Sequence, residues 1–412
     1  MKITFIAFTS TRGGAAKALT RVKNLLHNLG CETALVSIED NENRMPIYFK
    51  AMHYIVWVLS HLITKLQRND NASKHSLNIF GSHYIKREVK RAKLLHIHWI
   101  NNETLSIKDF VLFSNKSVIT LHDEWFYCGA EHYALDDSSY ARVVAGYTKN
   151  NKNVKGIDIN RLIWQCKKKY YSSLNGVIFT VPSTWMKRRA EKSDLLRDKD
   201  IRVVPNPINT DVFRSDKTNC SIDGIEPEDF VITFGAIDGG ASGIKGFDLL
   251  TEAVQVFSES VDSLTKIKII TFGGKQKTSS TMFGIKTIEL GHISSEKELA
   301  HIYSLSSVTI VPSRAESFGQ VAAESLACET PVIAFNYSGL TDIVKHKDNG
   351  YLAEPFDPHS LANGLLWFYS LSNDEKAHAG ISGRNHVLKV FSEEVIGEQL
   401  ISIYKELGYT DN

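Results

Sequence analysis

The first half of the chain alternates between short apolar runs and longer amphipathic stretches. The apolar runs predict buried strands, and the amphipathic stretches predict helices that pack against them. The predicted strands are 3–8, 33–38, 94–98, 117–121, 176–181 and 201–204. The predicted helices are 15–29, 158–173 and 184–192. Strands that alternate with helices indicate an α/β domain with a parallel sheet.

The second half repeats this alternation. Its predicted strands are 230–235, 266–272, 287–290, 308–311 and 332–335. Its predicted helices are 247–258, 296–305, 318–328, 358–369, 374–390 and 393–407. Two prolines stiffen the stretch 205–213 between the halves. We therefore predict two Rossmann-like domains, residues 1–208 and residues 209–391.

The stretch 307–339 carries the most distinctive chemistry. A buried strand is followed by a polar loop with Glu316, then by an Ala-rich helix containing Glu324, then by a second strand. Such a loop lies at the carboxyl edge of a parallel sheet, where ligands bind. The N–H groups of residues 318–320 should form an anion site at the helix start, and Gly319 permits a close approach. An anion site beside carboxylates, which accept hydrogen bonds from hydroxyls, suggests a nucleotide sugar.

The residues from Pro312 read P-S-x-x-E-S-F-G-x-x-x-x-E-x-x-A, followed by P-V-I-A and S-G. This string resembles the donor-site signature of the family 4 glycosyltransferases. The resemblance implies the GT-B architecture, which is two Rossmann-like lobes with the active site in the interlobe cleft. It implies a last helix, 392–408, that packs back on the first lobe. The implied reaction moves a sugar, with retention, from a UDP- or GDP-sugar to a growing saccharide.

The resemblance also implies roles for single residues. Lys245, in K-G-F-D-L-L, would neutralise the donor diphosphate; Glu316 would orient the donor sugar, and Glu324 would hold the ribose diol. The remaining donor-binding candidates are Gly13, Gly14, Gly273, Gly274, Ser317, Phe318, Gly319 and Gln320. A tight turn between strand and helix explains Gly13 and Gly14 equally well.

Many relatives carry a second basic residue near that lysine. Here Ile244 and Ala236 stand at the two places where it would be expected. Arg12 and Arg314 are the candidate substitutes, so the second phosphate ligand stays open.

Residues 120–133 read T-L-H-D-E-W-F-Y-C-G-A-E-H-Y. This segment resembles one in a branch that assembles surface polysaccharides of the O-antigen, capsule or colanic-acid type. The resemblance places His122 beside the reacting sugar, as a catalytic residue, and places His98 and Asp123 on the acceptor side. A buried, hydrogen-bonded histidine is the alternative for His98. His96-x-His98 lacks an evident third ligand and Asp198-x-Asp200 lies in a charged loop, so we expect no metal and no cofactor beyond the donor.

The charge of the chain is unevenly distributed. The net charge is +2 over 412 residues, but residues 1–210 carry 32 Lys and Arg against 18 Asp and Glu. Three basic clusters lie in this half, at 86–93, 167–171 and 187–189. They favour an anionic membrane surface as a partner. The apolar, aromatic stretch 47–68 predicts either a helix lying on that surface or a core helix of the first domain.

The remaining features of the sequence bear on the cellular location and on the alternative functions. Residues 133–156 show no period and predict a long loop. Five scattered cysteines without C-x-x-C indicate a reducing compartment, and there is no signal-peptide pattern or membrane-spanning run. We expect a cytoplasmic protein, peripheral at the inner face of the cytoplasmic membrane, with a lipid-diphosphate-linked acceptor. The alternatives are a nucleotide-sugar epimerase and a non-catalytic nucleotide-sugar-binding protein. We expect no nucleic-acid binding, because no recognition motif is present.

Overall fold

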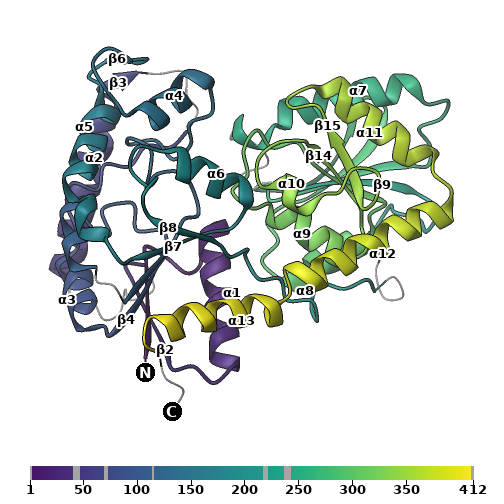
Figure 1. Ribbon diagram of the computed structural model, residues 1–412. Coiled ribbons are helices and arrows are strands. Elements are labelled where there is room, and N and C mark those ends of the chain that lie inside the picture. Colours follow the sequence, from purple (N-terminus) through teal and green to yellow (C-terminus); the bar gives the residue numbers. More distant parts are fainter. Residues whose placement is uncertain are drawn as a thin grey trace. The chain divides into compact units, whose positions relative to one another are not determined.

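The computed structural model describes residues 2–39, 47–68, 73–113, 116–216, 221–235 and 243–409 (Figure 1). Its internal contacts divide the chain into two compact units. Unit 1 comprises Met1–Asn206 together with Ile396–Asn412, and unit 2 comprises Pro207–Val395. The boundary lies within the proline-containing stretch, two residues before the predicted one, and the chain re-enters unit 1 near its end.

Unit 1 is built on a six-stranded sheet in which every neighbouring pair of strands is parallel. Its order is β2-β1-β4-β5-β7-β8. The strands are β1 (Ile3–Ala7), β2 (Thr33–Ser37), β4 (Leu94–Ile97), β5 (Ser117–Thr120), β7 (Ile178–Val181) and β8 (Asp200–Val203). From β1 the chain first adds a strand on one side and then returns to add β4 on the other. This reversal of order between β1 and β4 creates the kind of edge at which α/β sheets bind ligands.

The helices of unit 1 agree with the predictions except in one region. They are α1 (Gly14–Asn28), α2 (Ile47–Thr64), α3 (His83–Arg91), α4 (Asp137–Ala145), α5 (Ile159–Tyr170), α6 (Thr184–Lys192) and most of α13 (Glu393–Glu406). The prediction of a long loop over 133–156 is wrong, because this region contains α4 and the short strand β6 (Lys155–Gly156), which pairs with β3 (Gln67–Arg68). The Asp136 side chain caps α4 by accepting a hydrogen bond from the Ser139 N–H at 2.8 Å. A nine-residue helix is too short to show a clear period.

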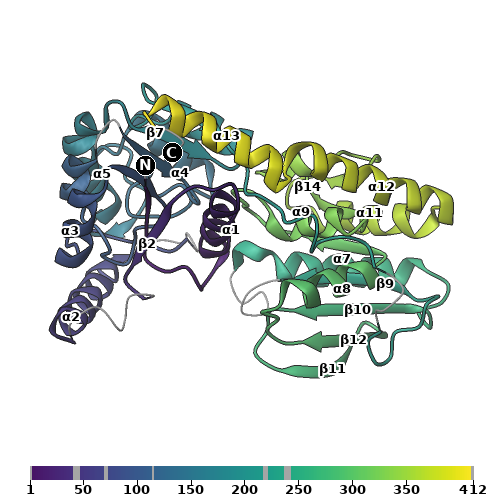
Figure 2. The same cartoon turned by 90° about the horizontal axis from the view of Figure 1, so that it is seen from below.

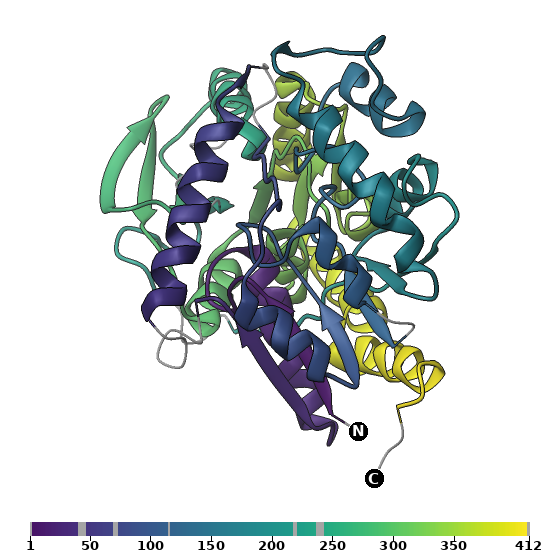
Figure 3. The same ribbon diagram turned by 90° about the vertical axis from the view of Figure 1, so that its left-hand side faces the viewer.

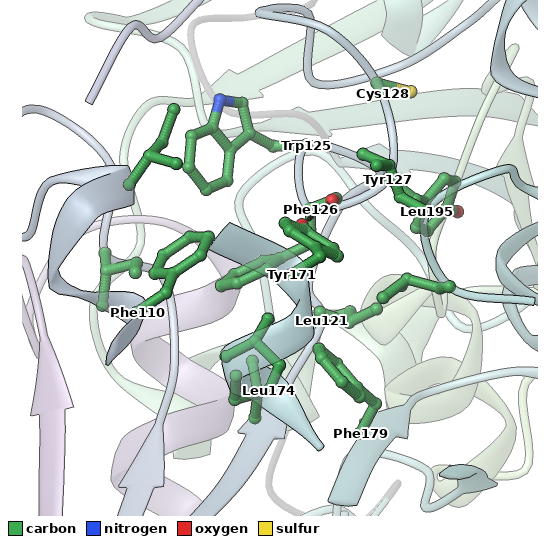
Figure 4. Close-up of a cluster of buried hydrophobic side chains, with 14 of the residues drawn as sticks. Phe110, Leu121, Trp125, Phe126, Tyr127, Cys128, Tyr171, Leu174, Phe179 and Leu195 are labelled. Carbon is green, nitrogen blue, oxygen red and sulfur yellow. Dashed lines mark hydrogen bonds between the residues drawn. The ribbon is translucent and has the colours of Figure 1, made fainter. Parts of the chain in front are cut away.

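Unit 1 has two buried apolar clusters. Figure 4 shows the first, in which the rings of Phe110, Phe126 and Phe179 pack together with other buried side chains. The second joins β1 to α1 and to α13, which contributes Ile396, Leu400, Ile403 and Tyr404. Helix α13 is therefore part of the core of unit 1, although it follows unit 2 in the sequence.

Unit 2 is built on a seven-stranded sheet with the order β11-β12-β10-β9-β13-β14-β15. The strands are β9 (Phe230–Gly235), β10 (Ile267–Phe272), β11 (Lys277–Met282), β12 (Ile285–Leu290), β13 (Val308–Val311), β14 (Val332–Phe335) and β15 (Gly350–Ala353). All pairs are parallel except β11 with β12, and β11 forms one edge of the sheet (Figure 2). The order reverses between β9 and β13, so unit 2 also has one ligand-binding edge of this kind.

Helices cover both faces of the second sheet. They are α7 (Phe247–Ser260), α8 (Glu296–Leu305), α9 (Gln320–Ala327), α10 (Leu340–Ile343), α11 (Pro358–Ser370) and α12 (Asn373–Val390). Alternate residues of β9 point into different clusters: Ile232 packs with side chains of α7 and α11, whereas Val231 packs with side chains of α8 and α9. Neighbouring residues of a strand point to opposite faces, so these clusters mark the two covered faces.

Candidate active site

Two charged side chains meet at the switch point of the unit 2 sheet. Lys245 follows β9 and Glu316 follows β13, and these strands are neighbours at the place where the order reverses. The Lys245 Nζ lies 2.6 Å from the Glu316 Oε1. Both side chains are partly exposed, at 34% and 16%. The structure therefore brings together two residues that are 71 positions apart and that the sequence analysis assigns to one site.

Hydrogen bonds hold Glu316 in place. The Ser313 hydroxyl donates to the carboxylate at 2.8 Å, and the Gly339 N–H donates to the backbone carbonyl of Glu316 at 2.9 Å. A residue of the same loop thus holds the carboxylate, and the turn before α10 holds the backbone of Glu316. A fixed carboxylate beside an ammonium group can accept hydrogen bonds from hydroxyls of a ligand whose negative charge the ammonium attracts.

Arg314 ties the two loops together. Its guanidinium makes a two-point contact with the Asp248 carboxylate, at 2.6 and 2.9 Å, and the backbone N–H of Arg314 donates to the carbonyl of Ile244 at 2.8 Å. Hydrogen bonding from Arg314 lowers the pKa of Asp248. Of the two candidates for a second phosphate ligand, Arg314 is thus engaged with Asp248, whereas the Arg12 side chain is 83% exposed. Ala236, with the rest of 236–242, lies outside the described residues.

Two glycines set the shape of these loops. Gly246 has φ of 68°, and a Cβ there would lie 2.0 Å from the carbonyl oxygen of Pro312. Gly319 has φ of 113° and caps α9, where a Cβ would lie 2.7 Å from the Leu340 Cδ2. Only glycine adopts these conformations without strain. At both places a neighbouring residue also leaves no room for a Cβ.

The anion site predicted from the sequence corresponds to the first turn of α9. Phe318 is 2% exposed and its ring packs against Phe391, which anchors the loop that also carries Ser317, Gly319 and Gln320. The first N–H groups of a helix have no partner inside it and lie at its positive end. This end begins four residues after Glu316 in the sequence, and the helix dipole gives it a positive character.

The remaining donor-side candidates lie close by in unit 2. Glu324 is on α9, is 2% exposed and accepts a hydrogen bond from the Tyr303 hydroxyl at 3.3 Å. Gly273 follows β10, and its N–H donates to the carbonyl of Gly291 at 2.7 Å. Gly274 lines a small cavity of about 110 Å³, together with Phe234, Phe247, Thr271, Phe272, Gln276, Met282, Thr287, Glu289 and Gly291.

A second polar cluster lies at the corresponding edge of the unit 1 sheet. His98 follows β4 and His122 follows β5, and the His98 Nδ1 lies 2.8 Å from the His122 Nε2. One of these nitrogens must donate and the other accept. Burial lowers the pKa of His122 to about 4 and lowers the pKa of His98 well below its usual range. Both rings are therefore neutral near pH 7, and the ring that accepts the shared hydrogen bond must be neutral in order to do so.

Among the described residues, only one of the two ring nitrogens of His98 has a hydrogen-bond partner. It is 1% exposed, and among the described residues its buried Nε2 has no hydrogen-bond partner. By contrast, the neighbouring His96 is held on both sides, by the Thr120 hydroxyl at 2.7 Å and the Tyr404 hydroxyl at 2.7 Å. The description of a fully hydrogen-bonded core histidine thus fits His96 and not His98.

Asp123 is the most constrained group of this cluster. Its carboxylate accepts hydrogen bonds from the Trp99 ring N–H at 2.8 Å, from the Trp125 N–H at 3.0 Å and from His132, whose Nδ1 lies 2.6 Å away. Burial alone would raise the pKa of Asp123, but His132 and these hydrogen bonds outweigh it and lower the pKa. The other nitrogen of His132 lies 2.8 Å from the Ser76 hydroxyl. His132 lies in the segment 120–133, but nothing in the sequence alone indicated a role for it.

The glycine pair after β1 completes this edge. Gly13 has φ of 88° and precedes the first residue of α1, Gly14. A Cβ at Gly13 would meet nothing within 4 Å, so a positive φ rather than crowding accounts for glycine here. Because β1 and β4 are neighbours, Gly13 and His98 follow strands that flank the switch point of unit 1.

Two basic residues that were assigned to membrane-facing clusters are buried instead. Lys167 is 0% exposed and donates to the carbonyl oxygens of Cys128, at 3.2 Å, and Gly129, at 2.7 Å, as well as Trp125; burial lowers its pKa to about 7. Arg189 is 8% exposed and pairs with Glu124. These side chains hold the 123–132 segment in place and are not available to a surface. Helical spacing could have predicted the burial of Lys167, because this residue shares the inward face of α5 with Ile163 and Trp164.

Further properties of the described residues bear on the predictions. They contain no group of three or more His, Cys, Asp and Glu side chains arranged to hold a metal ion. None of the helices within the described ranges is long and apolar enough to cross a membrane. Cys31, Cys128, Cys166 and Cys328 are free thiols, and Cys220 lies outside the described residues.

Comparison with known proteins identifies the segment that carries the unit 2 site. Residues 239–386 match the family described as glycosyl transferases group 1. This segment is similar to the group 1 glycosyltransferases. The chain is 30% identical over 201 residues to D-inositol 3-phosphate glycosyltransferase of Acidothermus cellulolyticus, which is 45% of this chain and 44% of that protein. It is 28% identical over 160 residues to the capsular polysaccharide biosynthesis glycosyltransferase CapM of Staphylococcus aureus, covering 37% and 41%. The chain thus matches about half the length, or less, of these curated relatives.

Solved structures extend the likeness of the fold to the whole chain. Sucrose-phosphate synthase of Thermosynechococcus elongatus superposes with a TM-score of 0.66 at 17% identity, covering 98% of both chains. HepE of Anabaena, solved with UDP and glucose, superposes with a TM-score of 0.58 at 14% identity, covering 98% of this chain and 99% of that one. At such low identities the likeness concerns the fold alone. The prediction of two Rossmann-like domains of the GT-B type is confirmed.

The buried histidines predict a loss of stability in acid. His75 donates from Nδ1 to the carbonyl of Ser73, so its Nε2, 3.3 Å from the Gln67 amide nitrogen, must stay unprotonated to accept. Burial lowers the pKa of His75 to about 4, below the usual value near 6.5 that the unfolded chain retains. Between these values the unfolded state binds more protons, so stability falls as the pH falls, by up to about 1.4 kcal/mol per pH unit for each such histidine. Urea unfolding at about pH 7 and about pH 5 should show this loss. His75→Gln should reduce it, and an equal loss in wild type and variant would contradict the assignment.

Proposed function

We propose that this protein is a retaining glycosyltransferase that moves a sugar from a UDP- or GDP-sugar to a growing saccharide. The observation that carries the proposal is the 2.6 Å pair of Lys245 and Glu316 at the switch point of the unit 2 sheet, beside the first turn of α9. This pair lies within the segment that matches the group 1 glycosyltransferases. A cation, helix N–H groups and a carboxylate at one place suit a ligand that has both phosphates and hydroxyls.

The chemistry follows from these groups. As the sugar leaves, negative charge grows on the diphosphate, and preorganised donors stabilise such charge without a metal. Lys245 and the N–H groups at residues 318–320 would supply this stabilisation. Glu316 would accept hydrogen bonds from the donor sugar, and Glu324 from the ribose. Gly273 and Gly274 would allow the nucleotide base to approach the backbone closely.

We assign the acceptor to unit 1. Neutral His98 and His122 and the ionised Asp123 offer hydrogen-bond acceptors and donors that suit the hydroxyls of a saccharide. His122 would contact the reacting sugar. The name of the relative CapM refers to capsular polysaccharide synthesis, and this supports an acceptor of surface polysaccharide assembly. We further propose that the acceptor is lipid-diphosphate-linked and that the protein works at an anionic membrane on the cytoplasmic side, which the positive excess of residues 1–210 supports.

A ligand panel followed by a turnover assay tests this proposal. A ligand that binds only the folded state raises the melting temperature, so a UDP- or GDP-sugar should raise it and an ADP-sugar should not. Nucleoside diphosphate should then be released only when a saccharide acceptor is present. Conversion of the donor sugar without an acceptor would identify an epimerase. Binding of the donor without turnover, over a broad set of acceptors, would identify a sensor. The absence of any nucleotide-sugar effect would overturn the proposal.

A further inference from the structure

Helix α2 is the most exposed helix of unit 1, with a single buried residue among its 18. Figure 3 shows it as the long indigo helix on the left of the view. All its residues are described, and Ser60 is the single buried one. Phe49 and Ile63 pack partly against the core and mark the side that faces the rest of the unit. The alternative of a core helix for residues 47–68 is therefore wrong, because most of the apolar side chains of α2 point away from the core.

The outward side of α2 is apolar. Its exposed side chains are Ile47 at 84%, Tyr48 at 63%, Met52 at 60%, Tyr54 at 64%, Ile55 at 53%, Leu59 at 46% and Leu62 at 53%, and Leu66 continues the row at 53%. With about 100° per residue, these positions span an arc of roughly 160°, and Phe49 and Ile63 lie outside it. A helix that pairs with one other helix needs a narrower seam. An arc this wide fits a broad apolar surface better than a single partner helix.

The charges around this arc have one sign. The sequence from Ile47 to Arg68 contains no Asp or Glu, and its charged residues are Lys50, Lys65 and Arg68. Tyr48, Tyr54 and Trp57 add three aromatic rings, which favour the boundary between water and lipid. Such a set complements an anionic surface with an apolar interior.

One flank of the arc opens on a polar pocket. Trp57, His61 and Lys65 of this stretch border a cavity of about 490 Å³ whose far wall includes Lys74 and Asn102. The Lys74 Nζ donates to the Asn102 side chain at 3.0 Å and lies 4.5 Å from the centre of the Trp99 ring. Trp99 in turn holds Asp123. The apolar arc thus adjoins a polar region that is continuous with the proposed acceptor cluster.

We infer that α2 docks unit 1 on a bilayer containing anionic lipids, with the exposed apolar arc lying in the boundary between headgroups and acyl chains. A helix with one apolar arc and a basic flank lies in the plane of this boundary and does not span the membrane. Lys50, Lys65 and Arg68 then meet the lipid phosphates. This inference deepens the membrane part of the proposed function, rests on it, and names the element responsible.

Flotation with vesicles tests the inference. The full chain is mixed with vesicles of phosphatidylethanolamine and phosphatidylglycerol, or of phosphatidylcholine alone. Wild type should float with the anionic vesicles. Ile55→Glu with Leu62→Glu places two charges on the arc and should reduce binding to the anionic vesicles at least tenfold. Both positions are 53% exposed, so the melting temperature should stay the same.

A matched control comes from α12 in unit 2. Ile381 and Leu388 are exposed at 54% and 39% and are also seven residues apart, so Ile381→Glu with Leu388→Glu adds the same charges elsewhere. This control should float like wild type. Equal flotation of the two variants, or no flotation of wild type, would overturn the inference. So would a wild-type dimer in the absence of vesicles that the α2 variant converts to monomers, because the arc would then be covered by a second copy of the chain.

A separate readout distinguishes this result from the proposed activity. The melting-temperature shift with UDP- or GDP-sugars should be equal in wild type and the α2 variant, since unit 2 is unchanged. Vesicle binding without any melting-temperature shift by nucleotide sugars would support the role of α2 and overturn the proposed glycosyltransferase activity. A melting-temperature shift by nucleotide sugars without vesicle binding would support the proposed activity and overturn the role of α2.

Discussion

Glu316→Gln is expected to lower the rate of sugar transfer about a hundredfold to a thousandfold while UDP binding changes little. The substitution keeps the shape of the side chain but removes the charge that pairs with Lys245 at 2.6 Å and accepts from Ser313 at 2.8 Å. A neutral amide cannot hold the donor sugar and its developing charge as a carboxylate does, and losses of this size follow removal of one preorganised polar group. Transfer is measured as nucleoside diphosphate released in the presence of acceptor.

Lys245→Ala distinguishes the role of Lys245 from that of Glu316. It removes the cation that we propose meets the diphosphate, so both UDP affinity and the transfer rate should fall, unlike in Glu316→Gln. Glu298→Gln is the control, because Glu298 is an exposed residue in the first turn of α8. Transfer by Glu316→Gln within about threefold of the control would remove Glu316 from the reaction.

Arg189→Met is expected to lower the free energy of unfolding by about 3–5 kcal/mol. Arg189 makes two contacts with Glu124, one of them at 3.0 Å, and Glu124 is 0% exposed. The Glu124 carboxylate also accepts from the Ala134 N–H at 2.7 Å and the Tyr127 hydroxyl at 3.1 Å. Without Arg189, a buried charge keeps these hydrogen bonds but loses its counter-ion, and leaving one ion of a buried pair is far more costly than removing both.

Urea unfolding measures this effect, and the neighbouring residue provides the control. Arg188 is exposed, so Arg188→Met should change the free energy of unfolding by less than about 0.5 kcal/mol. The double variant Glu124→Gln, Arg189→Met should be more stable than Arg189→Met alone, because the unpaired charge is gone. A double variant that is less stable than the single one would show that Glu124 is stabilised by something other than Arg189.

The unit 2 site was predictable because sequence neighbours build most of it. The strand 308–311, the strand 332–335 and the helix 296–305 have the predicted bounds, since apolar runs and capping residues define them locally. Glu316, Gly319 and Glu324 belong to one such stretch. That Lys245 reaches Glu316 depends on β9 lying beside β13, which periodicity does not reveal and which only the resemblance implied.

The features that were missed depend on contacts between distant residues. The polar sequence of β11, K-T-S-S-T-M, has no alternation that would mark a strand, and it forms one because β12 offers it a free edge. The charges of Lys167 and Arg189 are typical of surface residues. Helical spacing places Lys167 on an inward face, but the partners that make burial possible, the carbonyls of 125–129 and Glu124, become visible only in the structure. The role of His132 becomes visible only when its ring is seen bonded to Asp123 and Ser76.

The placement of α13 has a consequence for the order in which the chain matures. Side chains from Ile396 to Tyr404 close the apolar cluster around β1, and the Tyr404 hydroxyl lies 2.7 Å from His96. A ribosome synthesises these residues after the whole of unit 2. Domains generally fold as they emerge, so unit 2 should be native first, while the N-terminal sheet lacks part of the cover on one face until α13 has been synthesised.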